Sequence, residues 1–276
     1  MSRSDPIVIQ AGRGEQKYWR DVWRYRELLY LLAWRDVLVR YKQTVIGVLW
    51  VVIRPLLVMT VFTFAFGKIA KLPTEGNVPY PLLVLAGLLP WQFFAGALSE
   101  ASSSLVSNAN LITKVYFPRV IVPVSAVVTC AVDFAVTMCL LIGFMAWYGI
   151  WPSWRIVVVA PLFLLMFSAA IGAGLWLAAL NAKYRDFRYV VPFIVQFGLY
   201  VSPVGFSSKV VPDSLAWAYM LNPMVGVIDC FRWAFLNGDG QFGWRAILCS
   251  CMVSAILLIG GLTYFRRTER SLADVI

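Results

Sequence analysis

Six long apolar segments restrict the fold of this chain more than any other feature of its sequence. Each holds between 18 and 30 residues, and a helix needs about 20 apolar residues to cross a hydrocarbon core about 30 Å thick. Backbone polar groups at that depth must be satisfied within the protein, which favours helices. The sequence therefore predicts an all-α polytopic membrane protein with six transmembrane helices, at about residues 44–67, 82–105, 120–149, 155–182, 189–206 and 244–265.

Composition supports a membrane-embedded chain and argues against several enzyme classes. Of the 276 residues, 61% are hydrophobic and 14% are charged, which lies outside the range of soluble domains. There is no histidine, so the sequence offers no imidazole base, Ser–His triad or His-bearing metal site. It also lacks the Gly-x4-Gly-Lys-Ser/Thr loop that cradles phosphates. We therefore expect no catalytic residues and no ATP, metal or other cofactor on this chain.

The first 43 residues are predicted to form a cytosolic amphipathic segment. Within residues 16–43, aromatic and aliphatic side chains recur at helical spacing, with arginines between them. Cationic, Trp-rich amphipathic helices lie in the membrane interface. Asp36 and Arg40 form an i, i+4 pair in the favourable order.

Polar residues and prolines inside the spans need an explanation. Arg54-Pro55 is predicted to interrupt the first span, and Pro90-Trp91 the second. Arg54 either snorkels or lines a wet cavity, because an arginine at that depth is costly otherwise. Asp133 is the single acid of the third span. A proton relay would need a second acid or a histidine, and this span contains neither. We therefore interpret Asp133 as a buried hydrogen-bonding residue at a helix contact.

Two further segments carry packing and turn signals. In the fourth span, small residues recur every four positions, which lets helices approach closely: Ala170, Gly174 and Ala178. Residues 210–236 are apolar yet contain Asn222-Pro223, which breaks a helix. We therefore predict two short re-entrant helices on the external side, before the last span.

The distribution of positive charge predicts the topology. With six spans and both termini cytosolic, seventeen of the 24 Lys and Arg residues lie on the cytosolic side and six outside. This bias matches the positive-inside rule. The net charge of +10 is accordingly ascribed to cytosolic loops and anionic lipid, not to nucleic acid. In this topology residues 44–265 form the transmembrane domain, residues 266–276 a cytosolic tail, and the polar segment SNANLITKVYFPR (107–119) a cytosolic loop.

Six short motifs together resemble the membrane subunit of ABC type-2 exporters for O-antigen, capsule and teichoic-acid polysaccharides. They occur in the order of the chain: RYKQTVIGVLWVVIRPLL (40–57), GLLPWQFF (87–94), NANLITKVYFPRVIVP (108–123), NAKYRDFRYVVPF (181–193), SPVGF (202–206) and LNPMVGVIDCFRW (221–233). The resemblance implies a multi-pass permease of the bacterial plasma membrane that works as a homodimer. Each copy would pair with a separate cytosolic ATPase that binds ATP and Mg²⁺, and the substrate would be a polysaccharide on a lipid carrier.

The resemblance also implies roles for particular residues. The ATPase would be coupled through the loop between the second and third spans, by Asn110, Lys114, Tyr116, Pro118 and Arg119. Residues of the interface helix would lie near the ATPase or the entering lipid diphosphate, where guanidinium suits phosphate: Arg35, Arg40, Tyr41 and Lys42. The external gate would be shaped by Pro203, Asn222 and Pro223. Aromatic side chains on the spans are candidates for lining a glycan channel: Trp50, Trp91, Phe93 and Phe94.

Two alternatives stay open at this stage. One is an exporter of the same superfamily that carries a smaller lipid or a drug. The other is a membrane-embedded lipid-glycan transferase, for which Asp133 and Glu100 are the candidate acids within or beside the inner spans.

Overall fold

The computed structural model describes residues 15–42, 47–74, 78–184, 186–236 and 243–269. Over these ranges the chain is helical and contains no strand, which confirms the predicted all-α class. The elements before residue 120 are α1 (Glu15–Arg24), α2 (Arg26–Lys42), α3 (Gly47–Phe62), η1 (Thr63–Ile69), α4 (Tyr80–Ser107) and α5 (Ala109–Lys114). Those that follow are α6 (Ile121–Trp147), η2 (Trp154–Val158), α7 (Val159–Lys183), α8 (Phe187–Val201), η3 (Ser208–Val210), α9 (Asp213–Met220), α10 (Pro223–Leu236) and α11 (Trp244–Glu269).

Five helical segments in the described part of the chain are long and apolar enough to cross a membrane. They are Leu49–Ile69 (α3 with η1), α4, α6, Trp154–Lys183 (η2 with α7) and α11. The sixth apolar helix, α8, has 15 residues and is shorter than a typical span. A polytopic membrane protein is therefore confirmed, while the number of six crossings stays a prediction.

The prolines inside the spans do not end their helices. Helix α4 is continuous through Pro90, and α3 is continuous through Pro55, so the interruptions predicted at these residues are wrong. A proline removes one hydrogen bond, but neighbouring helices and local adjustment tolerate it in a membrane helix. By contrast, the break predicted at Asn222-Pro223 is confirmed, since α9 ends at Met220 and α10 begins at Pro223.

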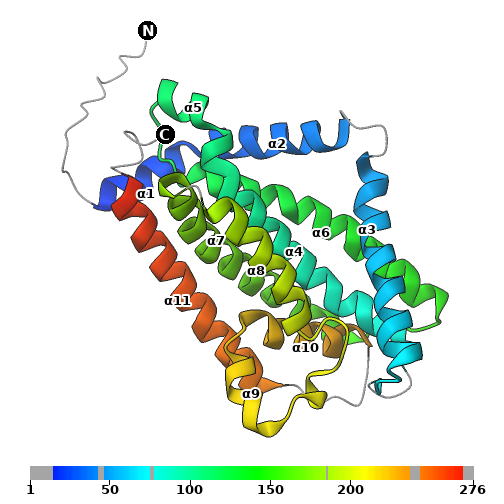
Figure 1. Cartoon of the computed structure of the whole chain (residues 1–276). Helices are drawn as coiled ribbons and strands as arrows, with labels where there is room; N and C mark the ends of the chain where they lie inside the picture. The colour runs from blue at the N-terminus through cyan, green and yellow to red at the C-terminus, as the bar shows by residue number, and fades with distance from the viewer. Residues whose placement is uncertain (1–14, 43–46, 75–77, 185, 237–242, 270–276) are drawn as a thin grey trace.

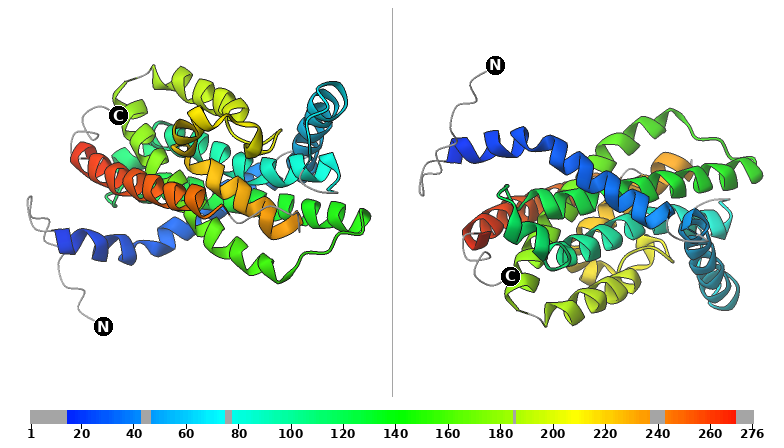
Figure 2. Two further views of the ribbon diagram at one scale, coloured as in Figure 1. Left: turned by 90° about the horizontal axis from the view of Figure 1, so that it is seen from below. Right: turned by 90° about the horizontal axis from the view of Figure 1, so that it is seen from above.

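Helix α4 forms the centre of the bundle and packs against α6, α7 and α10 (Figures 1 and 2). Residues 82–91 of α4 are all buried. Beside them, an aromatic cluster joins α4 to α6, α7 and α10 through ring contacts: Phe93, Phe134, Phe163, Phe167 and Phe231. The far end of α4 is held to α7 by the Asn181 side-chain amide, which donates to the Ser102 carbonyl oxygen at 2.8 Å.

The small-residue face of α7 brings neighbouring helices into close contact, as the sequence predicts. A methyl group built on Gly174 would lie 2.7 Å from the Ala101 Cβ of α4. On the adjoining side, a methyl on Gly172 would lie 2.4 Å from the backbone of Leu257 in α11. Backbones can approach this closely only where side chains are absent or small.

The two ends of the bundle differ in architecture. Helices α1, α2 and α5 and the last turn of α11 lie at one end, whereas η3, α9 and α10 lie at the other (Figure 1). Helix α2 runs across the first of these ends and contacts α6, and its own residues Leu32 and Ala33 are buried. We call these the α2 end and the α10 end.

Candidate functional site

The loop between α4 and α6 projects an exposed tip from the α2 end. Residues 113–116 are exposed, and Tyr116 has an exposed fraction of 70%. The next two residues, Phe117 and Pro118, are buried. Phe117 packs in a cluster that includes Leu32 of α2 and Phe265 of α11. The tip is therefore free to touch another molecule, while its base is fixed to the bundle. We call residues 109–119 the tip loop.

Glu269, a residue that the sequence analysis did not select, fixes the base of this loop. Its carboxylate accepts a hydrogen bond from the backbone N–H of Arg119 at 2.8 Å and another from the Tyr18 hydroxyl at 2.9 Å. The Arg119 guanidinium in turn donates to the Glu269 carbonyl oxygen at 2.7 Å. Burial and the Glu269 carboxylate raise the pKa of Tyr18, so this hydroxyl stays protonated and keeps donating. The contacts join α1, the tip loop and α11 at one point.

A second polar cluster attaches α2 to the bundle. The Arg40 guanidinium pairs with Asp133 of α6 and, at 2.8 Å, with Glu100 of α4. The Tyr41 hydroxyl also donates to Asp133. Burial and the Asp133 carboxylate raise the pKa of Tyr41, so it too remains a donor. Asp133 therefore lies at a helix contact and is hydrogen-bonded, as the sequence analysis favoured, but it is half-buried instead of buried.

The charge pairs along α2 differ from the predicted helical pair. Asp36 pairs with Arg35 at 2.8 Å, and Arg40 extends to the spans. Arg35 also donates to the Asn108 side-chain oxygen at 2.9 Å, just before α5. Arg35 thus connects α2 to the residue that follows α4, and Arg40 connects α2 to the interior of α4 and α6. Lys42 is exposed beside them.

At the α10 end, the predicted gate residues lie together around an irregular segment. Asn222 donates to the Ser202 hydroxyl at 2.9 Å and accepts from the Met224 N–H at 3.0 Å. The first bond ties the start of α10 to the segment that follows α8, and the second caps α10. Pro203 directly follows Ser202 in the sequence, and Pro223 directly follows Asn222.

Arg232 organises the same region, although the sequence analysis included it only as part of the motif at residues 221–233. It is 1% exposed and donates to three carbonyl oxygens: Leu83 at 3.1 Å, Val204 at 2.8 Å and Phe206 at 2.8 Å. A side chain on Gly87 would collide with it, since a methyl there would lie 2.7 Å from an Arg232 nitrogen. The sequence feature that could have identified Arg232 is that it is the single cation in an otherwise mostly apolar helix.

Two largely apolar helix faces are exposed among the residues that the structure describes. On α3 the exposed residues lie at helical spacing along one face: Trp50, Arg54, Leu57 and Val61. On α8 a stripe of exposed aromatic rings was missed by the sequence analysis, although their spacing was visible: Tyr189, Phe193, Phe197 and Tyr200. The two helices meet at the α10 end, where Phe62 and Tyr200 are 6.4 Å apart between ring centroids.

The four predicted channel-lining residues are placed differently from one another. Trp50 has an exposed fraction of 57%, whereas Trp91 and Phe93 are 6% and 3% exposed. Phe94 is half-buried. Their role in a channel stays a prediction, and Trp50 is the member of the set with an open surface. Arg54 shares that surface, so both interpretations of this residue stay open.

Comparison with known proteins gives one consistent result. A sequence profile described as "ABC-2 type transporter" matches residues 27–236. An O-antigen export system permease protein RfbA from Klebsiella pneumoniae is 31% identical over 255 residues, covering 91% of this chain and 95% of that protein. A protein of the same name from Myxococcus xanthus is 28% identical over 93% of this chain and 98% of its own length. The polysialic acid transport protein KpsM of Escherichia coli is 22% identical over 86% of this chain and 92% of its own.

Proposed function

Since this chain belongs to the ABC-2 type transporter membrane family, we propose that it is the permease subunit of an ATP-driven exporter of lipid-linked polysaccharide. Its similar relatives are permeases of O-antigen and capsule export systems, matched over nearly their full length. The observation that carries the proposal is this full-length similarity together with an exposed loop fixed to the bundle at its base. The protein would sit in the bacterial plasma membrane with both termini in the cytosol.

A separate cytosolic ATPase would supply the energy, binding ATP and Mg²⁺ on its own chain. The tip loop suits its docking because Lys114 and Tyr116 are exposed, while Phe117 and the Arg119–Glu269 bonds hold the loop base. A displacement of the tip by the ATPase would therefore be transmitted to α1 and α11 through the bonds of Glu269, because the loop base cannot bend independently of the bundle. Asn110 and Pro118 would set the shape of the same element.

The channel would form between two copies of the chain. The uncovered faces of α3 and α8 support this, because a second copy would shield part of their apolar surface from lipid. Aromatic faces stack on other rings and flat groups without requiring fixed hydrogen-bond geometry, which suits a polymer of repeating sugars. In this arrangement Trp50 and the rings of α8 would border the glycan path, and Pro203, Asn222 and Pro223 its external gate.

The lipid diphosphate of the substrate would enter beside α2. Arg40 and Lys42 lie in the last turn of α2 on either side of Tyr41 in the sequence, and Arg35 lies one to two turns away. Guanidinium groups bind phosphate oxygens in bidentate fashion. Because Glu100 is half exposed, a diphosphate could replace it as the partner of Arg40 while Asp133 keeps the guanidinium in place.

Co-purification with ATPase measurement tests the proposal directly. The tagged chain is expected to retain an ABC ATPase, and lipid-linked glycan is expected to stimulate ATP hydrolysis by the reconstituted complex. Depletion of the chain should cause lipid-linked polymer to accumulate on the cytosolic side. Normal surface glycan after depletion would overturn the proposal. Stimulation by a small lipid or a drug instead of by glycan would favour the smaller-substrate exporter.

The transferase alternative is tested by the same preparation. Asp133 and Glu100 are its candidate acids, and both are engaged with Arg40. If Asp133→Asn with Glu100→Gln leaves glycan structure unchanged, these acids do not catalyse sugar transfer.

A further inference from the structure

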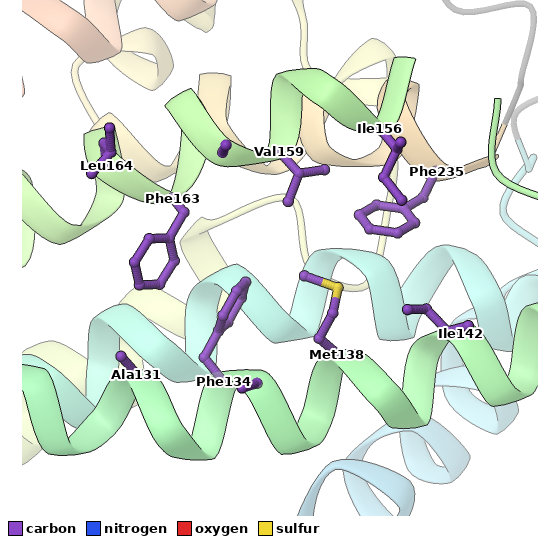
Figure 3. A pocket seen from close by; sticks show the side chains of 11 residues that line it. Ala131, Phe134, Met138, Ile142, Ile156, Val159, Phe163, Leu164 and Phe235 are labelled. Carbon is purple, nitrogen blue, oxygen red and sulfur yellow. The ribbon is translucent and has the colours of Figure 1, made fainter. Parts of the chain in front are cut away.

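An open apolar groove runs between α6 and α7 on the half of the bundle nearest the α10 end. Its volume is about 700 Å³. Side chains from the two helices point toward each other across it, as Figure 3 shows for Phe134 and Met138 of α6 and Phe163 of α7. Phe235 of α10 contributes to the same wall. Every residue that lines the groove is Ala, Val, Leu, Ile, Met or Phe, so the groove suits an apolar occupant such as a hydrocarbon chain.

The length of the groove matches one leaflet of a bilayer. Its lining on α6 extends from Ala131 to Ile142, which is about 16 Å along a helix that rises 1.5 Å per residue. Half of a hydrocarbon core of about 30 Å is about 15 Å. Since α6 begins at Ile121 at the α2 end and finishes at Trp147, the groove lies in the leaflet at the α10 end.

The groove ends at the level where a lipid headgroup would lie. Exposed tryptophans lie beyond Ile142, at the end of α6, in the connection and at the start of η2, with exposed fractions between 69% and 86%: Trp147, Trp151 and Trp154. Tryptophans of this kind mark the membrane–water interface. The groove therefore has the depth and direction of an acyl chain that hangs from that interface.

A cation adjoins the same end. Arg155 precedes Ile156, which lines the groove, and its guanidinium lies 4.7 Å from the centre of the Trp233 ring. Its Nη1 is buried and has no hydrogen-bond partner among the described residues. The Arg155 side chain as a whole is only half-buried, so its exposed part can meet the phosphate of a lipid headgroup beside the groove.

We propose that the α6–α7 groove binds one acyl chain of an anionic membrane phospholipid, whose phosphate pairs with Arg155. This site is separate from the path proposed for the glycan, because it lies between α6 and α7 while the uncovered faces that would border the path belong to α3 and α8. A lipid held there fills the space that the splayed helices leave open, and thereby supports the Phe134–Phe163 contact behind it.

Photo-crosslinking tests the proposal on the full chain in nanodiscs. The probe is phosphatidylglycerol with a diazirine on one acyl chain, and the crosslinked peptides are mapped by mass spectrometry. We expect labelling to concentrate on α6 and α7 around Met138, at least fivefold above the lipid-exposed residues Met252 and Ile256 of α11. Equal labelling of both regions would mean annular lipid only and would overturn the proposal.

Filling the groove provides a matched pair of variants. Ala135→Trp places an indole in the groove and should lower labelling of Met138 at least fivefold, whereas Val132→Trp, on an exposed face of the same helix outside the groove lining, should not. If Ala135→Trp does not fold, Ala160→Trp blocks the groove from α7. Equal labelling in the blocked and control variants would contradict the site.

Headgroup and competitor experiments identify the occupant. Arg155→Gln should lower the ratio of phosphatidylglycerol to phosphatidylcholine labelling several-fold, and an unchanged ratio would overturn the phosphate contact. Displacement of the probe by polyprenyl phosphate, or crosslinks between the α6 helices of two copies, would replace the phospholipid with another occupant. None of these readouts depends on glycan export, so they succeed or fail independently of the proposed function.

Discussion

The Glu269 carboxylate lies 2.8 Å from the backbone nitrogen of Arg119, although 150 residues separate them in the sequence. This bond joins the end of the last span to the base of the tip loop, and the Arg119 guanidinium returns a second bond at 2.7 Å. Tyr18 of α1 occupies the other carboxylate oxygen. A displacement of the loop must therefore move α1 and α11 with it or break these bonds.

Replacing Glu269 should weaken the transmission of force more than it weakens the fold. Hydrogen bonds to charged groups contribute about 1.5–3 kcal/mol, so Glu269→Ala should loosen the loop base. We expect export by the reconstituted complex to fall several-fold, while the amount of membrane-inserted chain and the basal ATPase rate stay near wild type. Glu269→Gln keeps an acceptor oxygen and should lose less.

Thr263→Ala is the control for this variant. It lies on the same helix, and its hydroxyl bonds to the Ile259 carbonyl oxygen of its own helix. Equal export by Glu269→Ala and Thr263→Ala would show that the contacts of Glu269 with Arg119 and Tyr18 do not contribute to export.

Lys114→Glu should reduce export without reducing membrane insertion. Lys114 is exposed at the tip loop, so reversing its charge disturbs a docked partner and leaves the core intact. The measurement compares glycan-stimulated ATP hydrolysis and ATPase co-purification for this variant with those for Lys209→Glu. Lys209 is exposed at the α10 end, away from the proposed ATPase. If both variants behave alike, the tip loop is not the docking element.

A double-mutant cycle should detect the Arg40–Asp133 contact. Removing one partner takes away part of the compensation of the other, half-buried charge, so Asp133→Asn and Arg40→Gln should each destabilise the chain. The coupling between them should be about 1–3 kcal/mol, as for residues in one charge network. The free energy of unfolding is measured by detergent denaturation of the purified chain.

Arg35 and Asp36 provide the comparison for this cycle. Their pair is more exposed, and surface pairs are worth about 0–1 kcal/mol. Strict additivity of Asp133→Asn and Arg40→Gln would contradict the structural contact.

These contacts mark the boundary of what the sequence could predict. Long apolar runs predict membrane helices because length and hydropathy are local properties, and Asn222-Pro223 predicts a break because the steric effect of proline is local. The pairing of Arg40 with Asp133 depends on the position of α2 across the bundle. Local spacing instead favoured Asp36, four residues away. Glu269 was not predicted either, because its contact with Arg119 joins residues 150 positions apart in the sequence.

Prolines in the spans show a different limit. A proline has no N–H to donate to the carbonyl four residues earlier, and its ring crowds that carbonyl, so it usually breaks a helix in water. Helix α4 nevertheless continues through Pro90 among buried neighbours. The aromatic stripe of α8 was visible as spacing, but deciding that it is uncovered required the packing of α4 and α7 against the opposite face. Trp91 and Phe93 belong to a similar aromatic run and are buried.

Arg232→Lys should loosen the segment that follows α8. Three carbonyl oxygens accept from the planar guanidinium, and an ammonium group cannot reproduce this geometry. We expect faster cleavage of residues 202–211 by a protease added from the external side, at unchanged insertion. Arg245→Lys is the control, because Arg245 is exposed near the start of α11. Equal cleavage rates in the two variants would mean that Arg232 does not hold this segment.

The contact between α7 and α11 predicts opposite effects of one substitution at two glycines. A methyl on Gly172 would lie 2.4 Å from the Leu257 backbone, so Gly172→Ala must separate the helices and should cost about 1–3 kcal/mol, as overpacking does. A methyl on Gly143 of α6 meets nothing within 4 Å. Gly143→Ala should therefore stabilise the chain by up to about 1 kcal/mol through helix propensity alone. Detergent-denaturation midpoints of the two variants should move in opposite directions from wild type, because only Gly172 lies where two backbones touch. A shift in the same direction would mean that helix propensity, and not the approach of α7 to α11, governs both sites.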